Sequence, residues 1–310
     1  MIDIIKKAIV KGAKLYSNVS GGKDGQAMTK VLIDWGFEIE ALVHADLGRA
    51  EWPESLKHCE KLSQWHKIPL TIITRTDGRD LVEHWQDRMK KLAGTGKPFW
   101  SSSASRYCTS DLKRDPINVF YTSTGYDLII SCEGIRSQES SARAKKNPLT
   151  IRERNSSSFY KGMTVEEAIE NFIPGKRLVL TWFPIFNFST EEVWNTYGNT
   201  SEQLQQFRKE YLKTGLINMG YINDPTWNFH PAYVYGNERV SCAMCVLANE
   251  SDIKIGAKHN PVLYDILVKM EIESGFTFRK DFSLQTLTKI KSNGNSYSAK
   301  IKEHGSRDCI

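Results

Sequence analysis

A glycine-rich turn, SNVSGGKDGQAM at residues 17–28, is the first part of the chain whose residues are suited to chemistry. Gly21 and Gly22 let a ligand approach the backbone closely, and a helix beginning after them points its N–H groups and positive dipole end into the same space. The turn also supplies a hydroxyl, an ammonium and a carboxylate, from Ser20, Lys23 and Asp24. These groups predict a phosphate-binding site, although a plain strand-to-helix turn has the same glycines.

Cys242 and Cys245 form a C-x-x-C pair, a spacing found in zinc sites, in redox sites and by coincidence. Six cysteines in 310 residues are too few for a disulfide scaffold. We therefore expect metal or redox chemistry in a reducing compartment.

The elements that position these residues alternate between strand and helix. Strands are predicted at 13–19, 37–43, 69–74, 126–132 and 178–185, and helices at 24–35, 53–67, 80–92 and 109–121. This alternation predicts an α/β fold, a doubly wound and mainly parallel sheet with helices on both faces. A capping box at Ser189 and Glu192 indicates that helices follow the sheet.

We expect one compact unit with an α/β nucleotide-binding core at 1–190 and a C-terminal helical region at 191–310 that carries the C-x-x-C pair. The basic, serine-rich piece at 136–162 is predicted to be a long mobile loop. The first residues lack the pattern of a signal peptide and no apolar run nears 18 residues, so we expect a cytoplasmic protein without membrane contact. A net charge of +6 suits phosphate-bearing ligands or a nucleic-acid partner, but an ordinary basic surface carries the same charge.

The turn resembles the SGGKDS loop of the PP-loop ATP pyrophosphatases, which cleave ATP between the α- and β-phosphates and bind the departing pyrophosphate at this loop. It lacks the spacing of the Walker loop and the three-glycine dinucleotide fingerprint. The matching residues are Ser20, Gly21, Gly22, Lys23 and Asp24. Gly25 stands where that family usually has serine, so one hydroxyl contact is missing. The resemblance implies that residues 20–25 bind the phosphates of ATP.

Five further segments, in the same order, resemble the 3′-phosphoadenosine 5′-phosphosulfate (PAPS) reductase branch of this superfamily. They are HADLGRAEWPES (44–55), RYCTSDLKRDPI (106–117), CEGIRSQESSAR (132–143), TWFPIFNFSTEEVW (181–194) and HPAYVYGNERVSCAMC (230–245). The resemblance extends from residue 15 to about residue 250 and implies the fold of the adenine nucleotide alpha hydrolases.

The resemblance implies that charged residues of these segments converge at the carboxyl edge of the sheet. Asp46 would accept a hydrogen bond from ribose or support Mg²⁺. The expected catalytic residues, which stabilise charge on the departing pyrophosphate, are Lys23, Asp24, Lys113 and Arg136. Further nucleotide contacts are expected from Arg106, Glu139 and Arg143. The basic residues Lys145, Lys146, Arg152 and Arg154 form either a solvated loop or a nucleic-acid contact.

Cys108 joins the C-x-x-C pair in the family pattern. Thiolates at Cys108, Cys242 and Cys245 suit a 4Fe-4S cluster, and zinc with three thiolates and a histidine is the alternative. A cluster held by three cysteines leaves one iron open to sulfide, as in tRNA-thiolating relatives of the superfamily. No fourth ligand is obvious from the sequence: His230 is a candidate, Cys309 stands at the extreme terminus, and Cys59 and Cys132 are expected in the core.

Length, cysteine layout and basic loop are most similar to the ATP pyrophosphatases of bacterial DNA phosphorothioation systems (Dnd and Ssp types). This implies cleavage of ATP to AMP and pyrophosphate, which adenylates an oxygen that sulfur later displaces. The cofactors are then ATP, Mg²⁺ and the cluster, and the partners are a sulfur donor such as a cysteine desulfurase and DNA or a DNA-modification complex.

Reduction of PAPS or adenylyl sulfate is an alternative function within the same branch. Reductases of the family use a nucleophilic cysteine in a C-terminal E-C-G-[IL]-H segment, whereas the tail here reads EHGSRDCI. A third reading is a non-catalytic nucleotide-binding subunit of a sulfur-transfer complex, which the missing hydroxyl at Gly25 favours.

Overall fold

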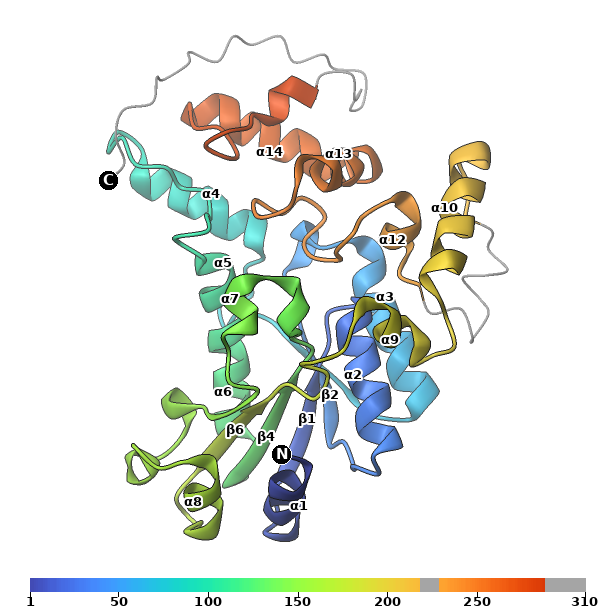
Figure 1. Cartoon of the computed structure of the whole chain (residues 1–310). Helices are drawn as coiled ribbons and strands as arrows, with labels where there is room; N and C mark the ends of the chain where they lie inside the picture. Colours follow the sequence, from blue (N-terminus) through green and yellow to red (C-terminus); the bar gives the residue numbers. More distant parts are fainter. Residues whose placement is uncertain (218–228, 288–310) are drawn as a thin grey trace.

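The computed structural model describes residues 1–217 and 229–287. Within them, six strands form one sheet in the order β3-β2-β1-β4-β6-β5 (Figure 1). The strands are β1 Lys14–Asn18, β2 Ala41–Ala45, β3 Leu70–Ile73, β4 Leu128–Glu133, β5 Leu149–Ile151 and β6 Leu178–Trp182. All neighbouring strands are parallel except the edge pair β5 and β6. This confirms the predicted doubly wound, mainly parallel sheet.

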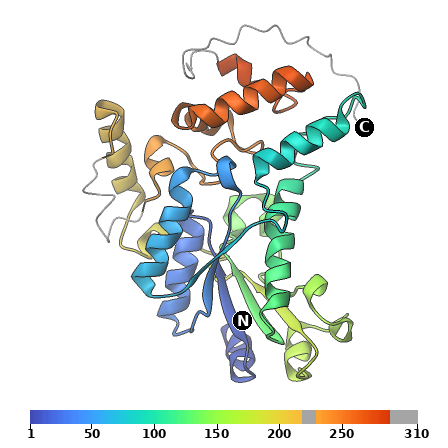
Figure 2. The ribbon, with the colours of Figure 1, turned by 180° about the vertical axis from the view of Figure 1, so that it is seen from behind.

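Residues of each strand alternate between two hydrophobic cores, one on each face of the sheet. In β4, Leu128 and Ile130 belong to the larger core, and Ile129 belongs to the smaller one. The helices that pack on the larger core are α1 Ile2–Val10, α2 Lys23–Asp34, α3 Pro53–His66, α8 Val165–Glu170 and α9 Thr190–Asn195. Helix α6 (Asp115–Ser123) covers the opposite face (Figure 2).

A third core lies beyond the carboxyl edge of the sheet, where the C-terminal helices meet α4 (Figure 1). Its rings include Trp85, Trp100 and Phe278, with centroids 5.5 Å apart for the first pair and 5.1 Å for the second. The helices around it are α4 Leu81–Leu92, α5 Tyr107–Thr109, α12 Pro231–Tyr235, α13 Glu250–His259 and α14 Pro261–Ser274. Two further helices are α7 Ser141–Ala144 and α10 Ser201–Thr214. Across the described residues, every helix is too short or too polar to cross a bilayer.

Two local predictions differ from the structure. Strand β2 begins at Ala41, because residues 37–40 form an irregular lead whose Phe37 and Ile39 are nevertheless buried. The piece at 136–162, expected as a mobile loop, contains α7, the edge strand β5 and short 3₁₀ turns. The predicted capping box is confirmed, since Ser189 accepts from the main-chain N–H of Glu192 and Glu192 accepts from that of Ser189.

Arg152 explains why part of that piece is ordered. Its guanidinium donates to Thr181 at 3.0 Å, Asn118 at 3.2 Å and Ser131 at 3.1 Å, and it forms an ion pair with Glu133. The side chain is only 14% exposed, so these bonds join β4, β5, β6 and α6 beneath the surface. Arg154, two residues later, is 61% exposed and pairs only with Asp115 in the described part of the chain.

We expect Arg152→Met to lower the free energy of unfolding by about 2–4 kcal/mol, because it removes the ion pair of Glu133 and one hydrogen bond from each of three polar groups. Arg154→Met is the matched control and should change stability by less than about 0.5 kcal/mol. Urea unfolding followed by circular dichroism measures both. Equal effects of the two substitutions would contradict the anchoring role of Arg152.

Candidate phosphate-binding site

A pocket of about 150 Å³ opens at the carboxyl ends of β1 and β4. The chain leaves β1 toward β2 on one side and β4 toward β6 on the other, so the pocket lies at the point where the strand order reverses. Ligands of open α/β sheets bind in this crevice. The lining residues are Asn18, Ser20, Gly22, Asp24, Gly25, Gly134, Glu139, Arg143, Tyr233, Arg239 and Val240.

The glycine turn joins β1 to α2 and presents the start of this helix to the pocket. Gly21 has φ +74°, and a Cβ there would lie 3.0 Å from the Cα of Ser55, so only glycine fits. The N-cap of α2 is Gly22, which has no side chain to cap the helix. The N–H of Lys23 donates to the hydroxyl of Tyr233 at 3.1 Å. The next two amides, of Asp24 and Gly25, bond to no other group in residues 1–217 and 229–287, which leaves them for a ligand at the positive end of the helix.

Gly25 departs from the serine of the PP-loop pattern for a reason visible in the packing. A Cβ at this position would lie 3.3 Å from the Cα of Val19 and 3.4 Å from the carbonyl oxygen of Asn18. A serine would therefore press against the end of β1. Glycine lets the first turn of α2 lie directly on the strand that precedes it.

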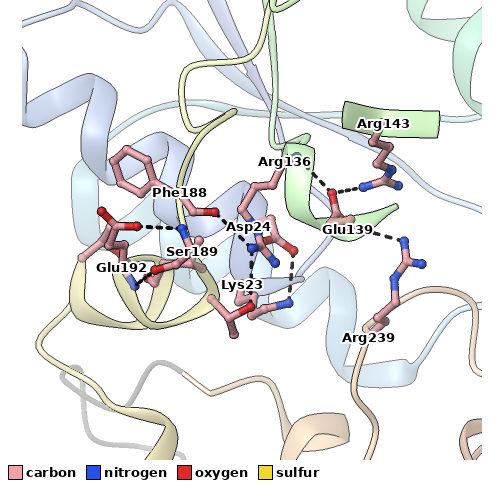
Figure 3. Close-up of polar contacts among 12 residues, drawn as sticks. Lys23, Asp24, Arg136, Glu139, Arg143, Phe188, Ser189, Glu192 and Arg239 are labelled. Atoms are coloured by element: carbon pink, nitrogen blue, oxygen red, sulfur yellow. Dashed lines mark hydrogen bonds and ion pairs between the residues drawn. The ribbon is translucent and has the colours of Figure 1, made fainter. Parts of the chain in front are cut away.

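Asp24 is held between two cations (Figure 3). Its carboxylate accepts a hydrogen bond from the Nε of Arg136 at 2.6 Å and pairs with the Nζ of Lys23 at 3.2 Å. Arg136 is only 4% exposed, and its other donors reach the carbonyl of Phe188 and the hydroxyl of Thr190 at the start of α9. This network fixes the loop, the segment after β4 and α9 relative to one another.

Lys23 faces away from the pocket. Its ammonium lies 5.3 Å from the ring centroid of Tyr233 and 5.9 Å from that of Trp194, and the residue is 7% exposed. Burial lowers the pKa of Lys23, but Tyr233 and Asp24 raise it by more, so the ammonium stays charged. Lys23 and Arg136, both expected to touch phosphates, thus contact Asp24 in this structure.

Two other guanidinium groups border the pocket, and one carboxylate holds them both (Figure 3). Glu139 forms an ion pair with Arg143 and lies 3.4 Å from the Nη2 of Arg239. The same carboxylate accepts the main-chain N–H of Arg136 at 3.0 Å, which fixes its position. Arg143 is 30% exposed and Arg239 is 58% exposed, so both can reach an anionic ligand.

Three residues expected at the nucleotide lie outside the pocket lining. Asp46 follows β2, and its carboxylate accepts the N–H of Gly48 at 2.7 Å. Arg106 is exposed just before α5. Lys113 lies among the cysteines: burial lowers its pKa, but Cys242, Glu51, Cys245 and Cys108 raise it by more.

The charges of the three cysteines expected to bind a metal all act on that ammonium. Burial and the neighbouring Cys245 raise the pKa of Cys242, and Lys113 opposes this shift. Cys242 also pairs by its main chain with Glu51, which ties the cysteine loop to the segment after β2. His230 is occupied elsewhere: its Nδ1 accepts from Ala232 and its Nε2 meets Ser55. Cys309 lies outside the described residues, and Cys59 and Cys132 are buried in the core.

Residues 14–215, well over half of the chain, match the family model described as Phosphoadenosine phosphosulfate reductase domain. The chain belongs to this family. Among solved structures, it is similar to the phosphoadenylyl-sulfate (PAPS) reductase from Candida auris in a phosphate complex, with 15% identity, 66% of this chain and 83% of that chain covered, and a TM-score of 0.41. No curated protein matches the chain.

Sequence reasoning missed several pocket residues of this PAPS reductase domain protein. Arg239 and Tyr233 stand in the segment 230–245, for which only the C-x-x-C pair and, as a candidate fourth ligand, His230 were predicted to be functional. Gly134 lies in the segment 132–143, beside the better recognised Arg136. Asn18 donates to Ser131 at 3.0 Å and to the carbonyl of Cys132, which joins β1 to β4 below the pocket.

We expect Gly134→Ala to weaken binding of a nucleotide by at least about tenfold, because the added Cβ would lie 2.7 Å from the main-chain carbon of Asp24 and 2.9 Å from the amide of Gly25. Titration calorimetry with a nonhydrolysable ATP analogue measures this effect, and circular dichroism confirms the fold. Ser137→Ala, in the same turn, is the control and should bind as the native protein does. Native affinity in the Gly134 variant would show that the ligand does not use these amides.

Proposed function

We propose that this PAPS reductase domain protein is an ATP pyrophosphatase. It would cleave ATP to AMP and pyrophosphate and adenylate an acceptor for sulfur incorporation, with DNA phosphorothioation as the process served. The observation that carries the proposal is the pocket at the switch point, where two helix-start amides and the guanidiniums of Arg143 and Arg239 face one space. Its volume of about 150 Å³ is below the roughly 300–1,000 Å³ of pockets that enclose whole ligands, so it suits the phosphates alone.

The reaction needs stabilisation of charge on a leaving diphosphate. An oxygen of the acceptor attacks the α-phosphorus, a new oxygen–phosphorus bond forms, and the bond to the β-phosphate oxygen breaks with its electron pair on pyrophosphate. The amides of Asp24 and Gly25 and the guanidiniums of Arg143 and Arg239 would bind this pyrophosphate. A sulfur nucleophile then displaces AMP from the adenylated acceptor.

Asp24, Lys23 and Arg136 would act by position rather than by touching the phosphates. They hold the first turn of α2 in place before ligand arrives, which lowers the reorganisation needed in the transition state. The carboxylates that line the pocket, Asp24 and Glu139, are each paired with two cations. Mg²⁺ would therefore arrive bound to the nucleotide, with water and phosphate oxygens as its main ligands.

The cysteine cluster supports a sulfur-transfer role. The charges of Cys108, Cys242 and Cys245 all act on Lys113, which indicates that the three thiols share one neighbourhood. Three thiolates there would suit an iron–sulfur cluster, with zinc as the alternative. Lys113 would stabilise the thiolates that hold it. Such a cluster would supply an iron with an open position for persulfide sulfur from a cysteine desulfurase, or for sulfide once a thiol reductant has reduced that persulfide.

Two other functions have an observation in their favour. Reduction of PAPS is favoured by the family description, and release of sulfite from PAPS with thioredoxin would identify it. A non-catalytic nucleotide-binding subunit is favoured by Gly25 and by the contact of Lys23 with Asp24. Binding of ATP without release of pyrophosphate would identify that subunit.

The proposal predicts release of AMP and pyrophosphate from ATP and Mg²⁺, measured with and without DNA. Arg239→Ala should lower kcat/KM for pyrophosphate release by about 10–100-fold, because one donor to the leaving group is lost. Arg79→Ala is the matched control, since Arg79 is 53% exposed and pairs with Asp87 away from the pocket lining, and it should keep native turnover. Absence of pyrophosphate release by the native protein under both conditions would overturn the proposal.

The cluster predicts visible colour in protein purified without oxygen. Cys242→Ser should remove the absorbance and the bound iron, because one thiolate ligand is lost. Cys132→Ala, a change in the buried core, should retain both. Colourless native protein with one equivalent of zinc would show that the cysteines hold zinc instead.

A further inference from the structure

A second group of potential ligands lies at the carboxyl end of β2. One ligand atom each from His44, Asp46 and Glu51 lies within 4.8 Å of the others. None of the three lines the phosphate pocket. The group stands between that pocket and the cysteine loop, and the proposed pyrophosphatase chemistry leaves it without a role.

His44 is oriented as metal-binding histidines are. It is completely buried, and its Nδ1 lies 3.1 Å from the carbonyl oxygen of Val19. A hydrogen bond to this carbonyl places the proton on Nδ1 and leaves the lone pair on Nε2. The sulfur of Cys59 lies farther from Nδ1, at 3.7 Å.

The Nε2 atom of His44 is buried, and none of its contacts with the described residues has hydrogen-bond geometry. It lies 3.1 Å from the Oε2 of Glu51, whose side chain is 10% exposed. A lone pair and a carboxylate at this distance repel each other unless a cation lies between them or Nε2 carries a proton. Burial lowers the pKa of His44, but Cys59 and Glu51 raise it to about 10, so a metal has to displace that proton.

The second carboxylate completes the donor set. One oxygen of Asp46 accepts the N–H of Gly48, and this bond fixes the carboxylate next to the strand end. Lys113 lies near Glu51 on the cysteine side and offsets one of the two negative charges. A cation with charge +2 would therefore meet two carboxylates, one imidazole nitrogen and one opposing ammonium.

We propose that His44, Asp46 and Glu51 bind one divalent first-row transition metal ion. One nitrogen and two carboxylate oxygens suit Mn²⁺, Fe²⁺ or Zn²⁺, whereas Mg²⁺ and Ca²⁺ prefer oxygen ligands alone. The remaining positions would be filled by water. This site does not depend on which reaction the phosphate pocket performs.

The surroundings indicate what the ion would do. Val19, which orients His44, is the residue before the phosphate loop. On the other side, Glu51 pairs by its main chain with Cys242, and Ala50 accepts the N–H of Ala243 at 2.9 Å. An ion held here would fix the distance between the phosphate loop and the cysteine loop, and so would position the two sites without touching nucleotide.

Binding is tested with Mn²⁺ on the full-length protein after chelation, without nucleotide. Mn²⁺ is chosen because thiolates bind it weakly, and loss of the electron paramagnetic resonance signal of aqueous Mn²⁺ reports binding. We expect one equivalent, a raised melting temperature and the same result with Cys108, Cys242 and Cys245 all changed to serine. Mg²⁺ at the same concentration should leave the Mn²⁺ signal unchanged.

Glu51→Gln and His44→Gln should each weaken Mn²⁺ binding by about 100-fold or more, since loss of a partner of a ligand already costs about 10–100-fold. Glu40→Gln is the matched control, because Glu40 pairs with Lys14 away from the carboxyl edge. If the His44 variant does not fold, Glu51→Gln and Asp46→Asn, which keep the side-chain size, decide the question. No binding by folded native protein, or native affinity in the folded ligand variants, would overturn the proposal.

Discussion

The carboxylate of Asp24 is the constraint on which the candidate site depends. The guanidinium of Arg136 and the ammonium of Lys23 both bind it, and both cations are almost completely withdrawn from solvent. Breaking a buried pair of this kind leaves an uncompensated charge, which costs more than the pair itself contributes. The phosphate loop, the segment after β4 and the start of α9 are therefore held together before a ligand binds, and the helix amides are aimed in advance.

Asp24 and Arg136 fix one side of the pocket, whereas the partly exposed Arg143 and Arg239 on the other side can change partners. Glu139 is anchored by the main chain of Arg136, and it holds Arg143 and Arg239 at the rim of the pocket. In the proposed function, an anionic ligand would compete with that carboxylate for the two guanidiniums, which already stand at the pocket. Glu139 thus holds both guanidiniums at the pocket, and Glu139 is itself bound to the main chain of Arg136.

The sheet and the glycine loop could be predicted because their signals are local. An apolar run such as 128–132 predicts a strand, and the glycines at 20–25 predict a turn, from a few neighbouring residues alone. The directions of the Lys23 and Arg136 side chains could not be predicted, because they depend on contacts with Tyr233 and with α9. These lie far away in the sequence and come close only in the folded chain. Arg152 was likewise grouped with a basic run, and its burial follows from contacts with β4 and β6, which are far from it in the sequence. His44 stands alone in the sequence and gains its neighbours by the turn after β2.

The hydroxyl of Tyr233 accepts the first amide of α2, so a residue from the C-terminal part of the chain completes a loop near its beginning. The region that matches the family ends at residue 215, whereas the pocket continues to Val240. Tyr233, Arg239 and Val240 thus line the pocket from beyond the matched region. A substitution among them would alter the pocket while the glycine loop stays the same.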